Sequence, residues 1–415
     1  MWKYIFILFL ELTDIIKVNF VGTISISGIF FIIWYVFKLS KGEFAKEFKF
    51  APIKKITNLY VALFFFQLIS EILVSNTMAN AMKGLAITAL SYMKFMCLWS
   101  YVKDDSKKIT FLFFSMALSK GLSFFISGAE FDEEALLEGT EFRVFKYTIA
   151  PMIAYMLVVF SLISNKRKFW ILMFIYVGSI CAILGARSTG LAVFLTGSIA
   201  LAIDYMGKKL SKSKIIAWSI MGSVIGYGCF VLYVNAVLSG DIVGGNSQAQ
   251  FTKVENPYNP IYILLAGRKE SPASIAAISD RPLTGFGAWA EDPNFKYNKI
   301  KFDFADEDFN ISRIHANIIP SHSVILGYGV NDGVFAMITV ALLIFFFISK
   351  GAKSLRKGSM YNCMIAYCIV SLIWNGLFSP TSRLRNSFPI IFCCCLFAYR
   401  QSVLERNRTY IMGNV

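Results

Sequence analysis

A histidine, three glycines, an asparagine and an aspartate lie at the start of an otherwise apolar segment, in IPSHSVILGYGVNDGVFAMI at 319–338. Polar groups in or beside a membrane are costly, so each of them calls for a reason. Pro320 suits a first helical turn, which predicts free backbone amides at Ser321, His322 and Ser323 near a helix N-terminus. That positive end attracts anions and disfavours imidazolium, so His322 is expected to stay neutral and able to accept a proton.

The same stretch holds five residues that weaken a helix, Gly327, Gly329, Asn331, Asp332 and Gly333. The apolar run after them is barely long enough for a membrane span. We therefore expect a surface helix, a break between 327 and 333, and then the membrane crossing, with the histidine at the external interface. The alternative is a solvated loop histidine followed by glycines that merely allow close helix packing.

Arginines on the expected external side are the second group of candidates. Arg187 lies in the short turn GARSTG, and Arg268 lies in LLAGRKE, within a long loop. Basic residues on the external side run against the usual bias, and a guanidinium group can grip phosphate with two parallel hydrogen bonds. The external arginines therefore predict an anionic partner. The ordinary alternative for each is that it anchors the protein at the membrane interface. Further candidates for glycan or phosphate contacts are Arg281, Arg313, His315, Arg383 and Arg385.

Other polar residues have a structural interpretation. Lys94 and Lys120 near the middle of apolar segments, and Glu71 toward the end of another, are expected to face the interior, as an ion pair or beside a wet cleft. The acidic FDFADEDFN is expected to be a solvated turn. All eight cysteines lie inside apolar segments and are expected to act as small hydrophobic residues, so neither disulfides nor a metal site is predicted.

Long apolar windows recur along the whole chain, which has 415 residues, 56% of them hydrophobic, and a mean hydropathy of +0.58. This pattern predicts an all-α polytopic membrane protein. The first window carries Glu11 and Asp14 and is the weakest, and no cleavable signal pattern precedes it, so it is expected to stay in the protein. The twelve expected spans lie at 4–17, 20–38, 56–75, 84–102, 109–127, 147–164, 169–185, 189–206, 215–234, 320–349, 360–378 and 386–402.

Charge sets the expected orientation. The net charge is +15, but the basic residues cluster in short loops between apolar segments, which indicates cytoplasmic loops rather than a nucleic-acid surface. Both termini are then cytoplasmic, and the acidic AEFDEEALLEGTE is external. The chain divides into an N-terminal bundle of nine spans at 1–234, one large external loop at 235–319, and three further spans with a cytoplasmic tail at 320–415.

The external loop is where chemistry is expected, because loops of this length are seldom idle connectors. Within it, SPASIAAISD predicts a short helix with Ser271 as its cap and Pro272 in its first turn.

Three stretches resemble the bacterial O-antigen polymerases and O-antigen ligases, which use glycans linked to undecaprenyl pyrophosphate. His322-Ser323, followed after nine residues by Gly333, is similar to the ligase-type pattern, although Ala336 stands where glycine, threonine or tyrosine is usual. Gly267-Arg268 with DRPLTGFG at 280–287 resembles the family's "Gly-Arg … Pro-Leu-x-Gly-x-Gly" segment. Arg187, in its short turn, resembles a third family position.

The resemblance implies a GT-C-like fold with about twelve spans and a large periplasmic loop in the bacterial inner membrane. It implies metal-independent and cofactor-free glycosyl transfer at the periplasmic face. His322 would act as base on the attacking sugar hydroxyl, or position it, and Arg187 and Arg268 would stabilise the departing undecaprenyl pyrophosphate. Donor and acceptor would both be lipid-linked oligosaccharides, with membrane lipid as surroundings and a chain-length regulator protein as a further candidate partner.

Polymerase and ligase are both compatible with these stretches. GFGAWAEDPNF and IIPSHS look more like polymerases, which add the growing chain to a fresh lipid-linked repeat, whereas the ligase hands finished glycan to lipid A-core. A flippase for the lipid-linked repeat is a third interpretation, and a membrane scaffold is a fourth. A transporter should concentrate polar groups near the midplane, and here most candidates gather at one face, which favours an enzyme.

Overall fold

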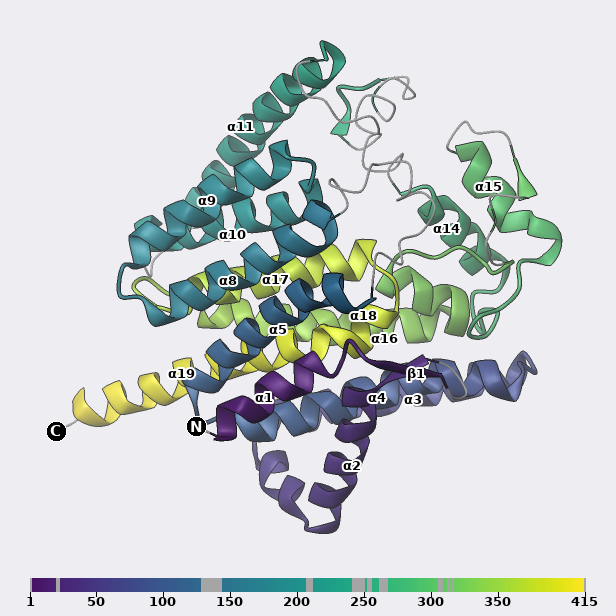
Figure 1. Ribbon diagram of the computed structural model, residues 1–415, viewed down its shortest axis with the longest axis horizontal. Helices are drawn as coiled ribbons and strands as arrows, with labels where there is room; N and C mark the ends of the chain where they lie inside the picture. The colour runs from purple at the N-terminus through teal and green to yellow at the C-terminus, as the bar shows by residue number, and fades with distance from the viewer. Residues whose placement is uncertain are drawn as a thin grey trace.

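The computed structural model is a bundle of helices (Figure 1). Among the described residues, strands occur only in one short hairpin, so the structure is consistent with the expected all-α class. The structure describes residues 2–19, 23–127, 144–206, 212–240, 251, 256–260, 268–304, 309–311, 314 and 317–413.

The helices of the N-terminal part are α1 (Trp2–Leu12), α2 (Ile26–Ser40), η1 (Glu43–Lys49), α3 (Ala51–Leu73), α4 (Met78–Val102), α5 (Ser106–Ser127), η2 (Phe145–Ile149), α8 (Ala150–Ile163), α9 (Arg167–Ile183), α10 (Arg187–Met206) and α11 (Lys212–Leu238). Those that follow are α14 (Glu270–Asp280), η3 (Pro293–Phe295), α15 (Lys296–Phe304), α16 (Val324–Ser354), α17 (Asn362–Phe378), α18 (Ser382–Asn386) and α19 (Phe388–Gly413). Each of the twelve expected spans overlaps at least one of these helices.

Six helices in the described part of the chain are long and apolar enough to cross a membrane: α3, α4, η2 with α8, α10, α16 and α19. Others are apolar but short, such as α2 and α17, and a full crossing needs about 20 residues. The helices therefore indicate a membrane protein, while the count of twelve spans stays a prediction.

The first two expected spans differ from the expectation in form. α1 has only 11 residues, and strand β1 (Lys17–Asn19) then pairs antiparallel with β2 (Thr23–Ser25), where the second span was expected to begin. Ser25 caps α2 by accepting a hydrogen bond from Gly28 N. The hydroxyls of Ser25 and Ser27 both donate to Asp14, at 2.7 and 2.5 Å. Asp14, one of the two acidic residues that weakened the first span, thus holds the start of α2.

α16 lies in the middle of the bundle and packs against α3, α17 and α19. Phe347 of α16 stacks on Phe392 of α19 with 3.8 Å between ring centroids. The three consecutive cysteines of α19, Cys393 to Cys395, are buried in this apolar core, as expected for small hydrophobic residues. The core fixes the position of α16 and so of the histidine that precedes it.

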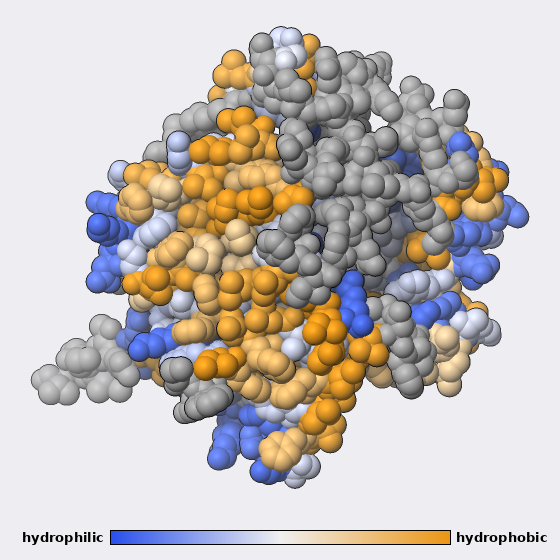
Figure 2. Space-filling model, viewed as in Figure 1, coloured by the Kyte–Doolittle hydropathy of each residue, from blue (hydrophilic) through white to orange (hydrophobic). Residues whose placement is uncertain are grey.

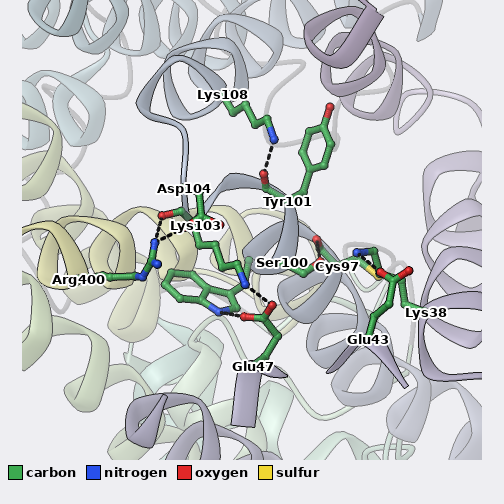
Figure 3. Close-up of polar contacts among 11 residues, drawn as sticks. Lys38, Glu43, Glu47, Cys97, Ser100, Tyr101, Lys103, Asp104, Lys108 and Arg400 are labelled. Carbon is green, nitrogen blue, oxygen red and sulfur yellow. Dashed lines mark hydrogen bonds and ion pairs between the residues drawn. The ribbon is translucent and has the colours of Figure 1, made fainter. Parts of the chain in front are cut away.

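Ion pairs link the loops at one end of the bundle (Figure 3). Glu47 accepts from Trp99 Nε1 at 3.0 Å and forms an ion pair with Lys103, and Arg400 of α19 pairs with Asp104 at 2.5 Å. Near the start of the chain, Tyr4 donates to Asp105 at 3.2 Å. The same loop therefore contacts both α1 and α19 at this end.

Two short helices, α14 and α15, stand beside the bundle (Figure 1). Across the middle of the face shown in Figure 2, apolar residues cover the bundle, and hydrophilic residues lie mainly toward its edges.

α14 begins at Glu270, one residue before the expected cap, so Ser271 is not the cap. Pro272 lies in the first turn, as expected. Lys269 occupies the capping position without a side-chain hydrogen bond.

Candidate functional site

The helix that follows the candidate histidine begins later than expected. Ser323 is the N-cap of α16, and its hydroxyl accepts from Leu326 N at 3.1 Å. The expectation that Pro320 opens the helix is wrong, because its carbonyl accepts a hydrogen bond from Ser274 of α14 at 3.0 Å, which holds this segment outside the helix. His322 is exposed and immediately precedes the cap. The backbone amides at the helix start therefore belong to 324 onward, not to 321–323.

The expected break in α16 is present at Gly333, where φ is 81° and ψ is 179°. The segment before it is largely buried rather than on the surface, because the loop at 282–288 covers it. Phe286 N donates to Val330 O at 2.9 Å, and Gly287 N donates to Asn331 O at 2.8 Å. Val334 N donates to Pro282 O at 2.7 Å. The loop thus satisfies backbone groups on both sides of the break.

Glycine is required where this loop meets the helix. A Cβ on Gly333 would stand 2.2 Å from Leu283 O, and a Cβ on Gly285, which has φ 64°, would stand 2.5 Å from Asn331 O. Both obstacles are backbone atoms, and both glycines have positive φ, which other residues rarely adopt. The glycines that carried the resemblance at 280–287 and 333 therefore fit against each other in space.

α3 holds the same loop from the other side. Glu71, 4% exposed, accepts from Ala288 N at 2.8 Å and from Asn76 Nδ2 at 2.6 Å. Ser70 donates to Thr284 O and to Asn331 O. Glu71 faces the interior as expected, but its recorded partners are amide groups rather than a cation. Its role as a loop anchor was not predicted, because no local pattern reveals a contact across more than two hundred residues.

A buried polar network joins the part of α16 before the break to α3 and α4. Asp332 is 2% exposed and accepts from Gln67 Nε2 at 3.3 Å. Thr88 donates to Gln67 and shares a 2.9 Å hydrogen bond with the Tyr328 hydroxyl. Oδ1 of Asp332 has no hydrogen-bond partner among the described residues. These bonds fix the rotation of the first part of α16 against α3 and α4.

Arg268 and His322 lie at the same end of α17. The Arg268 guanidinium stands 5.9 Å from the Trp374 ring centre and 5.3 Å from that of Phe378. The hydroxyl of Ser323, next to the histidine, donates to Gly376 O of the same helical turn at 3.0 Å. The C-terminal turn of α17 therefore brings together two stretches that are about fifty residues apart in the sequence.

Burial lowers the pKa of Arg268, and the nearby Glu270 and Tyr147 act in the opposite direction. An arginine still stays protonated at neutral pH. A partly buried guanidinium beside aromatic rings interacts with an anion more strongly than one in open water, because less water screens it.

Arg187 is the first residue of α10, and the residue before it packs near η2. Its neighbour Ala186 is buried against Phe145 and Ala150, while Tyr147 lies close enough to act on the charge of Arg268. The Arg187 guanidinium lies 5.6 Å from the ring centre of Tyr233 in α11. Through Ala186 and Tyr147, the regions of Arg187 and Arg268 both border η2.

Three other predicted arginines lie elsewhere. Arg281 is exposed at the end of α14 and stacks on Phe286 at 4.7 Å. Arg383 and Arg385 are on α18, where Arg385 lines a narrow polar pocket with Asp14 and Lys94. Burial lowers the pKa of Arg385, which Asp14 partly offsets.

The interior lysines are placed as follows. Lys94 is 5% exposed and lines the same narrow pocket as Asp14, so it faces the interior as expected. Lys120 is half-buried near Arg383. Other predicted residues lie outside the described part of the chain: Arg313, His315, Gly267 and the acidic residues at 306–308.

No protein-family model and no curated protein matches this chain.

Proposed function

We propose that this protein is an O-antigen polymerase of the bacterial inner membrane, which joins oligosaccharide repeats linked to undecaprenyl pyrophosphate at the periplasmic face. The observation that carries the proposal is the convergence of the three stretches behind the family resemblance. The loop at 282–288 is hydrogen-bonded on both sides of the break in α16. Arg268 and Ser323, the neighbour of His322, contact the last turns of α17. Ala186, the neighbour of Arg187, lies in one apolar cluster with Phe145 of η2.

In this mechanism the acceptor sugar hydroxyl attacks the anomeric carbon of the donor glycan. The new glycosidic bond forms as the bond from that carbon to the pyrophosphate oxygen breaks, and the hydroxyl proton passes to His322. Pyrophosphate leaves with its charge held by Arg268 and Arg187. Since pyrophosphate is already a good leaving group, positioning and charge stabilisation by the protein supply much of the rate enhancement.

His322 suits this role because it is exposed immediately before the N-cap of α16, and histidine is the side chain best able to accept a proton near neutral pH. The face of the bundle that carries these residues would be periplasmic. The opposite end, with its ion-paired basic loops and both α1 and α19, would be cytoplasmic, as the distribution of lysine and arginine predicts.

The test is the lipopolysaccharide ladder of a strain that lacks the protein, complemented with wild type, His322→Ala, Arg187→Ala or Arg268→Ala at matched membrane levels. Ser321→Ala, next to the histidine, is the control. The deletion strain should carry lipid A-core with a single repeat, and only wild type and the control should restore the ladder. General base assistance is worth about 10² to 10⁴-fold, so His322→Ala should lose at least that much.

Bare lipid A-core in the deletion strain, with long glycan accumulating on undecaprenyl pyrophosphate, would instead identify a ligase. A normal ladder from all three substituted proteins would overturn the assignment of the site.

A further inference from the structure

A surface hollow lies at the other end of α14 from the candidate active site. Arg281, just beyond this helix, opens onto a wide, shallow hollow that is also lined by Leu73, Val74, Pro282, Leu283 and Thr284. Two of these side chains, Leu73 and Leu283, are 64% and 65% exposed. The hollow therefore combines one guanidinium group with mainly apolar lining residues.

Charge favours an anion in this hollow. The nearest carboxylate in sequence, Asp280, already accepts hydrogen bonds from Lys296 and Tyr297, each at 2.6 Å. Both bonds lower the pKa of Asp280, so it stays ionised and paired at neutral pH. No carboxylate within ion-pair distance of Arg281 is recorded among the described residues. The Arg281 guanidinium lies 4.7 Å from the ring centre of Phe286, and a guanidinium group can bind phosphate through several N–H groups at once.

The hollow is at the level where a lipid headgroup would lie. Leu73 and Val74 are at the C-terminal end of α3, one of the helices long and apolar enough to cross a membrane. The same helix carries a stripe of four exposed apolar residues at helical spacing: Val61, Phe65, Leu68 and Ile72. An amphiphile with an apolar chain and a phosphate fits this arrangement, because the chain can follow the stripe while the phosphate meets Arg281.

α14 separates this hollow from the candidate active site by a fixed length. Three contacts show that α14 runs alongside residues 320–334 in the same direction. Ser274 bonds to Pro320 O, Ile278 packs on Gly329, and Pro282 O accepts from Val334 N. Arg268 and His322 are therefore together at one end. Arg281 is at the other, roughly 16 Å away for 11 residues at 1.5 Å each.

We propose that Arg281 and this hollow bind the lipid pyrophosphate of the acceptor, the polyprenyl-linked repeat unit that receives the growing chain. The inference rests on the proposed polymerase function. A polymerase must hold two lipid-linked substrates at once. In the acceptor the attacking hydroxyl is at the far end of the oligosaccharide from the pyrophosphate, so its phosphate site must lie well away from the base. Arg187 and Arg268 then serve the donor, and Arg281 serves the acceptor.

The experiment uses the full chain in nanodiscs of phosphatidylcholine, with the lipid-linked repeat extracted from the strain that lacks the protein. Preformed lipid-linked polymer is held at a saturating concentration, and incorporation of radiolabelled single repeat is followed as its concentration varies. Arg281→Gln should raise the KM for the single repeat about tenfold or more while kcat changes little, and Arg281→Lys should restore part of the affinity. The tenfold figure is that expected for loss of one charge-assisted hydrogen-bond pair, about 1.4 kcal/mol.

Two further variants make the result specific. Leu283→Glu places a negative charge in the hollow without touching the arginine, and it should raise the same KM. Lys299→Gln removes one exposed positive charge from the same part of the chain, and it should leave KM unchanged.

An unchanged KM in both Arg281→Gln and Leu283→Glu would overturn the acceptor site while leaving the polymerase proposal intact. If the effect appears only when phosphatidylglycerol is added to the nanodiscs, the hollow binds bulk anionic lipid and the inference is again wrong. Failure of the wild-type protein to incorporate any repeat would instead contradict the proposed function itself.

Discussion

Arg268 shows how a single side chain depends on its shape as well as its charge. Its guanidinium lies against Trp374 and Phe378 at the end of α17, and partial burial weakens the screening of its charge. A lysine would keep the charge but lose the flat group that can stack on rings and bind phosphate at two points.

We expect Arg268→Lys to lose most polymer synthesis, by roughly tenfold or more, because planar two-point binding is lost. The measurement is the initial rate of chain extension by protein in nanodiscs. Lys269→Arg, the reverse exchange at the next residue, is the matched control and should keep its rate. Full activity of Arg268→Lys would show that the site needs only a point charge.

Ser323 joins the start of α16 to the end of α17. Ser323→Ala should lower the free energy of unfolding by about 1 to 2 kcal/mol, the typical cost of a lost helix cap. Denaturant titration in detergent measures this, with Ser321→Ala as the neighbouring control. A change below about 0.3 kcal/mol would indicate that water replaces the cap, since caps in peptide hosts are worth no less than about 0.5 kcal/mol.

Among the elements, the broken helix α16 determines the shape of the site. Its two parts meet at Gly333, and the loop at 282–288 supplies hydrogen bonds on both sides. Glu71 and Ser70 of α3 then hold the loop in place. The position of the histidine therefore depends on three segments that are far apart in the sequence.

Gly333→Ala should destabilise the protein by at least about 2 kcal/mol, because it combines a strained φ with a clash against Leu283 O. Gly226→Ala is the control. A Cβ there meets nothing within 4 Å, so this helical exchange should be neutral or stabilising by up to about 1 kcal/mol. Thermal unfolding of both variants in the same detergent measures the difference, and equal stabilities would contradict the account of the break.

The sequence predicted the break but not what covers it. Glycines with Asn331 and Asp332 make a weak helix by local propensity alone, and this is visible in one sequence. The start of α16 was misplaced because Pro320 resembles a first-turn proline, whereas its carbonyl is bound by Ser274 from another helix. The serine at 323 was the available signal, since serine is among the preferred N-caps. The anchoring by Glu71 depends on a long-range contact that local patterns do not contain.

At the scale of the whole molecule, the two ends of the bundle have different chemistry. One end carries ion pairs between loops, including Lys103 with Glu47 and Arg400 with Asp104 (Figure 3). The candidate residues Arg268 and His322 lie at the C-terminal end of α17, beside the segments that precede α16. Apolar side chains dominate the helices between the two ends (Figure 2).

This arrangement predicts opposite accessibility for two exposed lysines, Lys299 of α15 and Lys357 after α16. In intact cells, a membrane-impermeant maleimide should label Lys299→Cys and spare Lys357→Cys. Permeabilised cells should show labelling of both. The wild-type chain is the control, because its described cysteines are buried. Labelling of Lys357→Cys alone in intact cells would reverse the proposed orientation.

The contact between the loop and the break in α16 also limits which substitutions such a protein can accept during evolution. A Cβ at Gly285 would meet the carbonyl of Asn331, and a Cβ at Gly333 would meet the carbonyl of Leu283, so the obstacle in each case is main chain. No substitution of a partner side chain can remove a backbone carbonyl. Among related sequences, these two positions should therefore be fixed as glycine rather than covary, whereas the side-chain network around Gln67 and Thr88 can drift through compensating exchanges.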